Sequence, residues 1–181
     1  MNTESIPESN VYKMGFVVSN IEEAMGRYGK LYKIDKWYRV LREPGGEGYL
    51  DGGFDGDGEC EIVVGFTRRM EIDLIVTSGG SNIYAAFMRE NGEGLHHLSF
   101  CVRDIKAAME DYEKLGYEVV SKGKQGKKRS RRYYVFMSRH GDPNSRVIEL
   151  VEMRFGSLRI MHPPRSMLYS IMSGSLEPID R

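Results

Sequence analysis

The sequence predicts an α+β fold built from two βαβββ modules, and three observations lead to this prediction. The segment MGFVVSNIEEAMGRYGKLY (14–32) matches LSFCVRDIKAAMEDYEKLG (98–116) at a constant offset of 84 residues, with eight of nineteen positions identical. Each copy opens with an apolar strand-like run and continues with apolar residues at helical spacing. Each is then followed by three more strand-like runs. Such a repeat indicates two copies of one supersecondary unit.

The first module is expected to begin with a strand over 11–18. Asn20 is placed to cap the helix that follows, with Glu23 three residues later as in a capping box. Ile21, Ala24 and Tyr28 give this helix its apolar face. Three strand-like runs complete the module: WYRVLR (37–42), ECEIVVGF (59–66) and MEIDLIVT (70–77).

The second module repeats this order after a predicted helix over SNIYAAFMREN (81–91) and a turn at NGEG (91–94). Its first strand covers 95–103, Asp104 caps its helix, and Gly116 stands where a left-handed helix stop belongs. Its last three strands are YEVVSK (117–122), RRYYVFMS (131–138) and SRVIELVEM (145–153).

We therefore divide the chain into four parts. They are a first module (11–78), a linker helix and turn (79–94), a second module (95–153) and a C-terminal extension (154–181). The extension carries a Pro163-Pro164 break and a short apolar stretch, and we expect it to pack on the outer face of the fold or on a partner subunit.

Composition limits the classes of function. The 26 Lys and Arg residues balance the 26 Asp and Glu residues, so no global field draws the protein onto nucleic acid or an anionic membrane. No apolar run approaches the ~20 residues that a membrane helix needs, and the N-terminus has no signal-peptide pattern, so we expect a cytoplasmic protein. Cys60 and Cys101 form neither a disulfide framework nor a C-x-x-C pair.

Strand alternation gathers polar side chains on one face of the sheet. It places His97, Ser99 and Cys101 together, and the repeat makes Lys13 the equivalent of His97. Asp73 and Glu149 are a second equivalent pair, in IDLIV (72–76) and IELVE (148–152). An imidazole and two carboxylates predict a divalent-metal site for Fe, Zn, Mn, Co or Ni. The alternative is that the histidine has its hydrogen-bond partners within the sheet and that the carboxylates face solvent.

Two segments carry a family resemblance. GEGLHHLSFCVRDI (92–105) and the RVIELVE ending (146–152) resemble the vicinal oxygen chelate superfamily, which includes glyoxalase I, bleomycin resistance proteins and extradiol dioxygenases. The chain looks most like its methylmalonyl-CoA epimerase and lactoylglutathione lyase members over about residues 11–153. The resemblance implies that the paired modules form a cup-shaped mixed sheet around one divalent metal.

Carried over residue by residue, the resemblance makes His97 and Glu149 metal ligands. Asp73 stands at a position where the epimerase-like members usually have Gln or Glu. Lys13 is a departure, because the family has a histidine there, in an H-x-G strand. The metal is therefore expected either to bind through His97, Asp73 and Glu149 or to be absent, with the Lys13 ammonium replacing it between the two carboxylates.

The implied chemistry is isomerase, epimerase or lyase action on a 2-oxo or acyl-thioester small molecule, through an enolate that the metal stabilises. The extra carboxylate base of the epimerases falls in DGGFDGDGE (51–59), where Glu59, Asp57 and Asp55 are candidates. Lys13 is a further candidate for a catalytic role. The alternative for this segment is a solvated acidic loop.

A basic run, KGKQGKKRSRR (122–132), is the remaining candidate for binding. Lys127, Lys128 and Arg129 could hold the anionic arm of a CoA or glutathione thioester, and the alternative is a solvated hairpin loop.

Three functions therefore stay open: a metal-dependent isomerase, epimerase or lyase; a metal-free binding protein of the antibiotic-sequestering type, which Lys13 favours; and an extradiol dioxygenase, which needs a second histidine. The partners expected are a small-molecule substrate and a second copy of the chain in a homodimer.

Overall fold

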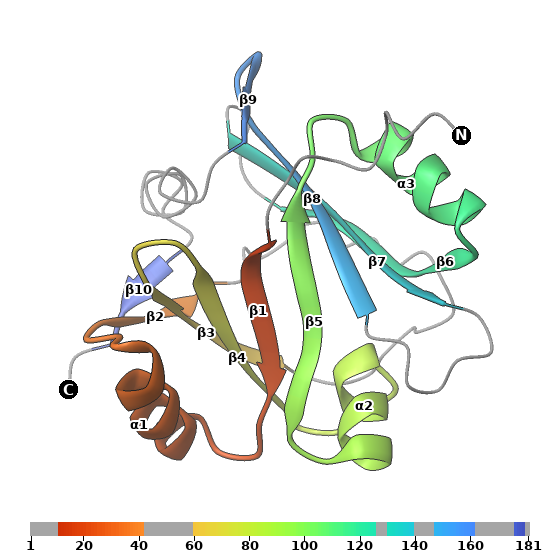
Figure 1. The fold of residues 1–181 in the computed structure, drawn as a ribbon. Coiled ribbons are helices and arrows are strands. Elements are labelled where there is room, and N and C mark those ends of the chain that lie inside the picture. Colours follow the sequence, from red (N-terminus) through yellow and green to blue (C-terminus); the bar gives the residue numbers. More distant parts are fainter. Residues whose placement is uncertain (1–10, 42–59, 126–129, 140–146, 162–175, 180–181) are drawn as a thin grey trace.

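The structure is a computed structural model that describes residues 11–41, 60–125, 130–139, 147–161 and 176–179. The helices and strands of these ranges follow the order that the repeat predicts (Figure 1). In the first half they are β1 (Val11–Val17), α1 (Ile21–Tyr32), β2 (Trp37–Val40), β3 (Cys60–Phe66), β4 (Glu71–Thr77) and the linking helix α2 (Ile83–Asn91). In the second half they are β5 (Gly94–Cys101), α3 (Ile105–Lys114), β6 (Tyr117–Gln125), β7 (Ser130–Arg139), β8 (Val147–Phe155), β9 (Leu158–Ile160) and β10 (Leu176–Pro178).

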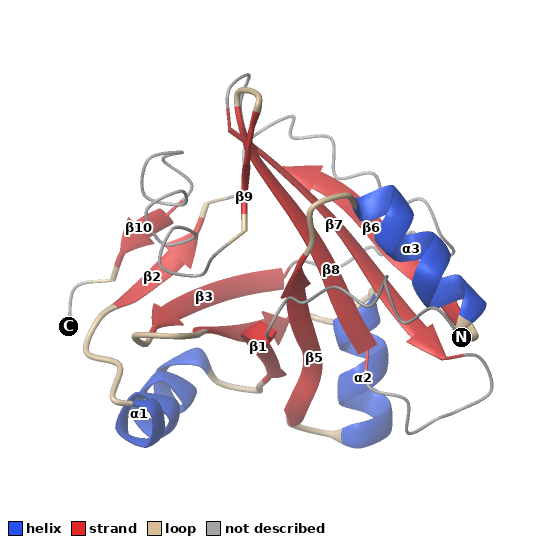
Figure 2. Cartoon of the chain, turned by 45° about the horizontal axis from the view of Figure 1, so that its top comes forward, coloured by secondary structure: helices blue, strands red, loops and turns tan. Residues whose placement is uncertain are grey.

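All of these strands belong to one mixed sheet. Its order is β10-β2-β3-β4-β1-β5-β8-β7-β6, with β9 paired to β8. β1 runs parallel to β4, β5 runs parallel to β8, and β1 and β5 meet antiparallel in the centre. The two halves therefore have the same strand order on either side of the β1–β5 junction. The sheet curls into a half-barrel (Figure 2), which confirms the predicted fold class.

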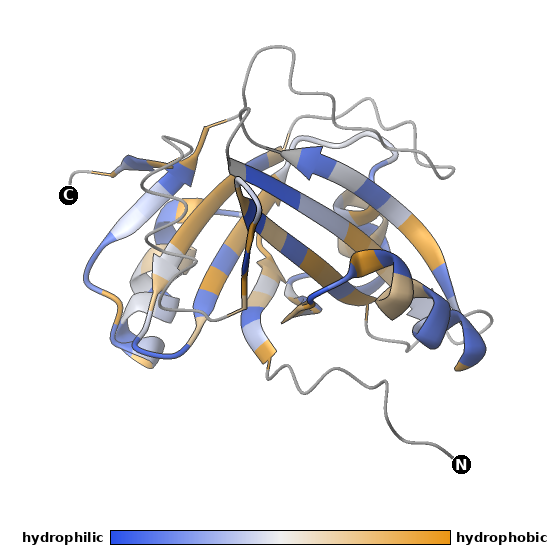
Figure 3. Ribbon diagram, turned by 90° about the horizontal axis from the view of Figure 1, so that it is seen from above, coloured by the Kyte–Doolittle hydropathy of each residue, from blue (hydrophilic) through white to orange (hydrophobic). Residues whose placement is uncertain are grey.

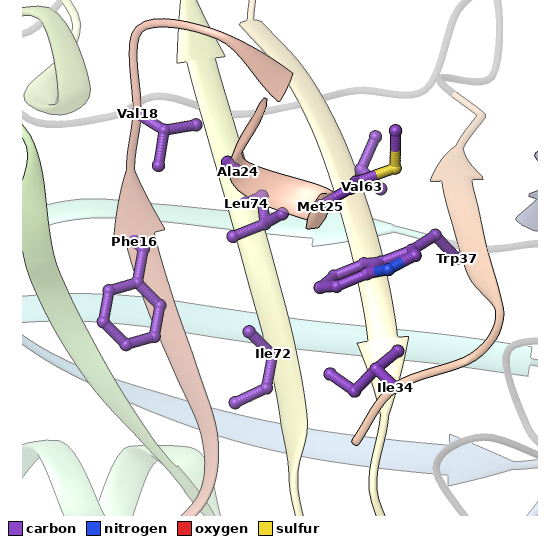
Figure 4. Close-up of a cluster of buried hydrophobic side chains, with 9 residues drawn as sticks. All are labelled: Phe16, Val18, Ala24, Met25, Ile34, Trp37, Val63, Ile72 and Leu74. Carbon is purple, nitrogen blue, oxygen red and sulfur yellow. The ribbon is translucent and has the colours of Figure 1, made fainter. Parts of the chain in front are cut away.

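Helices α1 and α3 cover the outer face of the sheet, one on each half. Under α1 lies a cluster of buried apolar side chains in which Phe16 and Leu74 meet Met25 and Trp37 (Figure 4). The corresponding cluster under α3 contains Ala108, Leu150 and Met137, with Phe100 packed against it. Hydrophilic and hydrophobic bands alternate along several strands (Figure 3), as expected when the two faces of a sheet differ.

Local signals in the sequence fix the helix ends. The Asn20 side chain accepts a hydrogen bond of 3.1 Å from the backbone N–H of Glu23, and Asp104 accepts bonds from the first turn of α3. Gly116 has a φ of 84°, the left-handed conformation predicted for it. Helix α1 is instead capped by Lys33, a non-glycine residue that follows Tyr32 and has a φ of 57°.

Two irregularities interrupt the β1–β5 pairing and were not predicted. Val11 pairs with Phe100 but Lys13 pairs with Ser99, so Tyr12 is an extra residue on β1. Gly15 pairs with His97 but Phe16 pairs with Leu95, so His96 is an extra residue on β5. A bulge breaks the two-residue alternation of a strand, so the periodicity of the sequence does not predict which face the side chains of Tyr12 and His96 occupy.

Part of the C-terminal extension adds strands to the sheet. β9 pairs with β8, and β10 pairs antiparallel with β2 and forms the edge of the sheet on that side. Residues 162–175, which include Pro163, Pro164 and the apolar stretch, lie outside the described residues. Among the described helices, none has the length and apolarity to cross a membrane.

Candidate functional site on the inner face of the sheet

The polar side chains predicted to converge do meet on the inner face, opposite α1 and α3. Lys13 Nζ lies 3.0 Å from Asp73 Oδ2 and 2.8 Å from Glu149 Oε2, so it joins β1 to β4 and to β8. Glu149 Oε2 also lies 3.7 Å from His97 Nε2. All four residues are buried, with 5% or less of their surface exposed. The pairing of Lys13 with both carboxylates is the arrangement expected if its ammonium replaces a metal ion.

Glu149 is the centre of this group. Besides its contact with Lys13, it accepts a hydrogen bond from the hydroxyl of Ser99, its register partner on β5. Arg132 on β7 approaches its other carboxylate oxygen, Oε1, at 3.9 Å. Arg132 also donates to the hydroxyl of Tyr12 at 3.4 Å, so the bulged residue of β1 becomes part of the same network.

The electrostatics keep the central pair charged. Burial and Arg132 lower the pKa of Lys13, but Asp73, Glu149 and Glu71 outweigh them and hold this pKa above its ordinary value. Burial raises the pKa of Glu149, and Lys13 and Arg132 overcome that effect and hold it at about 2. A buried ammonium with two carboxylates therefore satisfies the rule that buried charges are paired.

Glu71 is a buried carboxyl that the sequence analysis missed. It is two residues from Asp73 on β4 and is the register partner of Lys13, so it lies on the same face. Burial and the neighbouring Asp73 raise its pKa to about 7. The strand alternation that selected Asp73 also places Glu71 on the inner face, and this signal was available in the sequence.

His96 is a second residue that the sequence analysis missed. The bulge in β5 brings its ring beside that of His97, with 2.9 Å between the two Nδ1 atoms. The ring of His97 lies over Gly15, where an added Cβ would overlap it. Tyr84 on α2 packs against both imidazoles, at ring-centroid distances of 5.0 and 6.4 Å.

The donor set does not fit a resident divalent metal. The Lys13 ammonium stands between the two carboxylates, and a divalent ion there would meet its positive charge at short range. Among the described residues, no group of three or more His, Cys, Asp and Glu side chains is arranged to hold a metal ion. Three buried atoms of this network, His97 Nε2, Asp73 Oδ1 and Arg132 Nε, have no hydrogen-bond partner in the described part of the chain. At these three atoms a bound ligand would find free polar groups.

The other predicted site residues cannot be placed. Glu59 and its alternatives Asp57 and Asp55 lie outside the described residues, as do Lys127, Lys128 and Arg129 of the basic run. Their predicted roles, as the base and as the grip on an anionic arm, stay predictions.

Comparison with known proteins identifies the family. The family model of the glyoxalase/bleomycin resistance protein/dioxygenase superfamily matches residues 12–136. The chain belongs to this superfamily. A search of curated proteins found no match.

Several solved structures share the fold of this chain at low identity. A methylmalonyl-CoA epimerase from Mycobacterium tuberculosis is 19% identical with a TM-score of 0.51, over 78% of this chain and 85% of that one. The Streptomyces coelicolor epimerase, solved as a variant with 2-nitronate-propionyl-CoA, is 15% identical with a TM-score of 0.51, over 79% and 96%. A variant of 4-hydroxymandelate synthase from S. coelicolor is 10% identical with a TM-score of 0.62, over 93% of this chain and 55% of that one. Identities this low show the fold alone.

Proposed function

We propose that the protein binds a small carbonyl compound on the inner face of its sheet without a divalent metal, and that the Lys13 ammonium faces the carbonyl oxygen. The observation that carries this proposal is the placement of Lys13 Nζ, 3.0 Å from Asp73 and 2.8 Å from Glu149. The ammonium occupies the position between the carboxylates that the family resemblance assigns to the metal. It supplies positive charge and N–H donors there.

An acyl thioester is the first ligand class to examine. A fold neighbour was solved with a propionyl-CoA derivative, and this supports a thioester for the present chain too. The charge of the cluster also fits a carbonyl group, because Lys13 is already paired with two carboxylates and has no need of a further anion. A neutral acceptor with a polarisable oxygen adds a hydrogen bond without upsetting this balance.

Isomerase or epimerase action is a second candidate, and Glu71 is the observation that favours it. A carboxyl group with a pKa of about 7 exchanges protons near neutral pH, as a general acid or base must. It lies beside Lys13, whose charge would stabilise a developing enolate oxygen. Glu59 remains a further candidate for the base.

Binding of propionyl-CoA in the presence of a chelator tests the main proposal. The expected result is the same affinity with and without EDTA, measured by titration calorimetry, because no divalent ion takes part. A Lys114→Gln variant is the matched control, since Lys114 is an exposed lysine on α3 that pairs with Asp111. Lys13→Gln should lose binding while Lys114→Gln keeps it. Binding that appears only when a divalent metal is added would overturn the proposal.

A further inference from the structure

The hairpin of β8 and β9 ends in two apolar side chains that face solvent. Phe155 and Leu158 are register partners, and the turn between them consists of Gly156 and Ser157. Leu158 is 69% exposed and Phe155 is 39% exposed. The tip of the hairpin projects beyond the strands beside it (Figure 1 and Figure 2), so it is open to contact from outside.

This pair differs from the other large apolar side chains that are exposed among the described residues. Those are Leu31 near the end of α1, Leu41 after β2 and Leu115 after α3, so each belongs to a different element. Apolar side chains that are exposed singly are ordinary on a protein surface and need no partner. Phe155 and Leu158 instead flank one turn and together present one apolar surface.

Three arginines lie one register position behind the apolar pair. Arg154 is paired with Arg159 on β9 and with Arg131 on β7. Residues directly opposite one another project from the same side of a sheet, so the three side chains form a row across β7, β8 and β9. Side chains alternate along a strand, so this row projects from the opposite side of the hairpin to Phe155 and Leu158.

Two carboxylates offset part of the charge of this row. Glu152 accepts a hydrogen bond from Arg154 Nε, and its Oε1 lies 3.9 Å from Arg159 Nε. Arg159 also lies 3.7 Å from Asp104 Oδ2. Glu152 is buried and accepts a second hydrogen bond from the first backbone N–H of α3, so its carboxylate points into the protein, whereas the three arginines stay exposed or partly exposed. Three guanidinium groups against two carboxylates leave a positive excess beside the hairpin.

The order of these groups along the hairpin matches the order of layers at a membrane surface. Successive positions of a strand are about 3.3 Å apart, so the arginine row follows the apolar pair at about that distance. At a bilayer surface, apolar side chains enter the boundary of the acyl chains, and the charged headgroups lie next to it on the water side. The long arginine side chain reaches such headgroups while its apolar stem stays nearer the acyl chains. A hairpin that approaches end-on therefore places each group in the layer that suits it.

A lipid surface fits this tip better than a protein partner does. A specific protein interface buries about 800 Å² on each partner, and two side chains at the end of a two-stranded hairpin supply only a small part of that area. Anionic lipids also supply the negative charge that balances the arginine row. The 26 basic and 26 acidic residues of the whole chain cancel, so attraction over long distances is absent, but a local excess still acts within a Debye length of about 10 Å.

We propose that the β8–β9 hairpin docks end-on on an anionic lipid surface, with Phe155 and Leu158 at the boundary of headgroups and acyl chains. Arg131, Arg154 and Arg159 then face the lipid phosphates. The contact is reversible and depends on salt, because two apolar side chains and a few charges bind a membrane far more weakly than a spanning helix does. The inference does not rest on the proposed function, since the ion cluster of the inner face takes no part in it.

Sedimentation with lipid vesicles tests the inference on the full chain. Wild type should sediment at low salt with vesicles of equimolar phosphatidylcholine and phosphatidylglycerol, and should stay in solution with pure phosphatidylcholine or at high salt. The Phe155→Ser/Leu158→Ser double variant should lose sedimentation, whereas the control Leu31→Ser/Leu115→Ser should keep it. Failure of wild type to sediment, equal binding to both kinds of vesicle, or equal sedimentation of the two double variants would overturn the proposal.

Arg131→Gln tests the contribution of charge. It should bind the mixed vesicles about fivefold more weakly than wild type. The matched control is Arg68→Gln, because Arg68 is an exposed arginine in the turn between β3 and β4, and this variant should bind as wild type does. Equal affinities of the two arginine variants would contradict the role of the arginine row.

Leu158→Trp locates the contact and does not depend on the folding of the double variant. Trp37 is the single tryptophan of the chain and is buried, so a ring at the tip adds a distinct fluorescence signal. Mixed vesicles should shift the emission of Leu158→Trp to shorter wavelength, because the ring leaves water, and should not shift that of the control Leu115→Trp. An unshifted Leu158→Trp would overturn the proposal. So would a wild-type dimer that Phe155→Ser/Leu158→Ser converts to a monomer in light scattering, because the tip would then cover a second copy of the chain.

Discussion

The Tyr12–Lys13 pair of β1 and the His96–His97 pair of β5 occupy equivalent places in the two modules. Both pairs follow the 84-residue offset, and in each the first residue is the extra residue of a bulge. Their partners differ. Tyr12 meets Arg132 and Lys13 meets two carboxylates, whereas the two histidines bond to each other.

This difference shows that the outer and inner faces of the sheet follow separate constraints. The outer faces kept matching apolar residues, such as Phe16 and Phe100, because each must pack against a helix. On the inner face both halves have a bulge, but the side chains there differ. The first half contributes the cation of Lys13, and the second half contributes the two neutral rings of His96 and His97. The architecture is symmetric, and the chemistry of the site is not.

The largest expected effect comes from breaking the ion cluster on the β1 side. Lys13→Met removes the ammonium that pairs with the buried Asp73 and Glu149, and this should lower the free energy of unfolding by about 3–5 kcal/mol. Urea unfolding of wild type and variant measures the loss. Lys114→Met removes an exposed ion pair and should leave stability unchanged. If Lys13→Met also left the free energy of unfolding unchanged, the buried ion pairs of Lys13 would form only weakly.

The next-largest effect concerns the two apolar clusters on the outer face, one under α1 and one under α3. Phe16 is 9% exposed and packs against the ring of Tyr28 at 4.6 Å between centroids, whereas Phe100 is only partly buried. Phe16→Ala should therefore cost about 3–5 kcal/mol and Phe100→Ala roughly 2 kcal/mol. Thermal or chemical denaturation gives both values. Equal losses would show that the α1 and α3 clusters are packed alike.

A smaller effect concerns pH and the carboxyl of Glu71. Its pKa is raised from 4.5 to about 7 in the folded protein, so the folded state holds a proton that the unfolded state releases between these values. Stability from this group is therefore present below pH 4.5 and is lost as the pH rises through 7. Glu71→Gln should remove this loss, which is on the order of 2 kcal/mol between pH 5 and 8.

The measurement is the difference in unfolding free energy between wild type and Glu71→Gln at several pH values. His96 and His97 act in the opposite direction, because burial lowers their pKa values, but they are present in both proteins and cancel in the difference. A difference that does not change with pH would show that Glu71 is ionised throughout this range.

The sequence predicted the fold and the principal inner-face residues through local and repeated patterns. Cap residues such as Asn20 and Asp104 act on their own helix ends, so a short stretch of sequence reveals them. Lys13, Asp73 and Glu149 were found because the repeat places them on one face. Tyr12 and His96 were not, since a bulge depends on the pairing of β1 with β5, which are far apart in the chain.

The metal content of purified protein tests the replacement of a metal by Lys13 most directly. The experiment uses wild type, Lys13→His and the surface control Lys114→His. Each protein is incubated with Zn²⁺ or Co²⁺ and passed through a desalting column, and its metal content is then measured by inductively coupled plasma mass spectrometry. Wild type and Lys114→His should retain no tightly bound metal, whereas Lys13→His should retain one ion per chain, because it replaces the ammonium with a fourth ligand beside His97, Asp73 and Glu149. One equivalent of metal in wild type, lost on Glu149→Gln, would contradict the replacement and make the protein a metalloprotein.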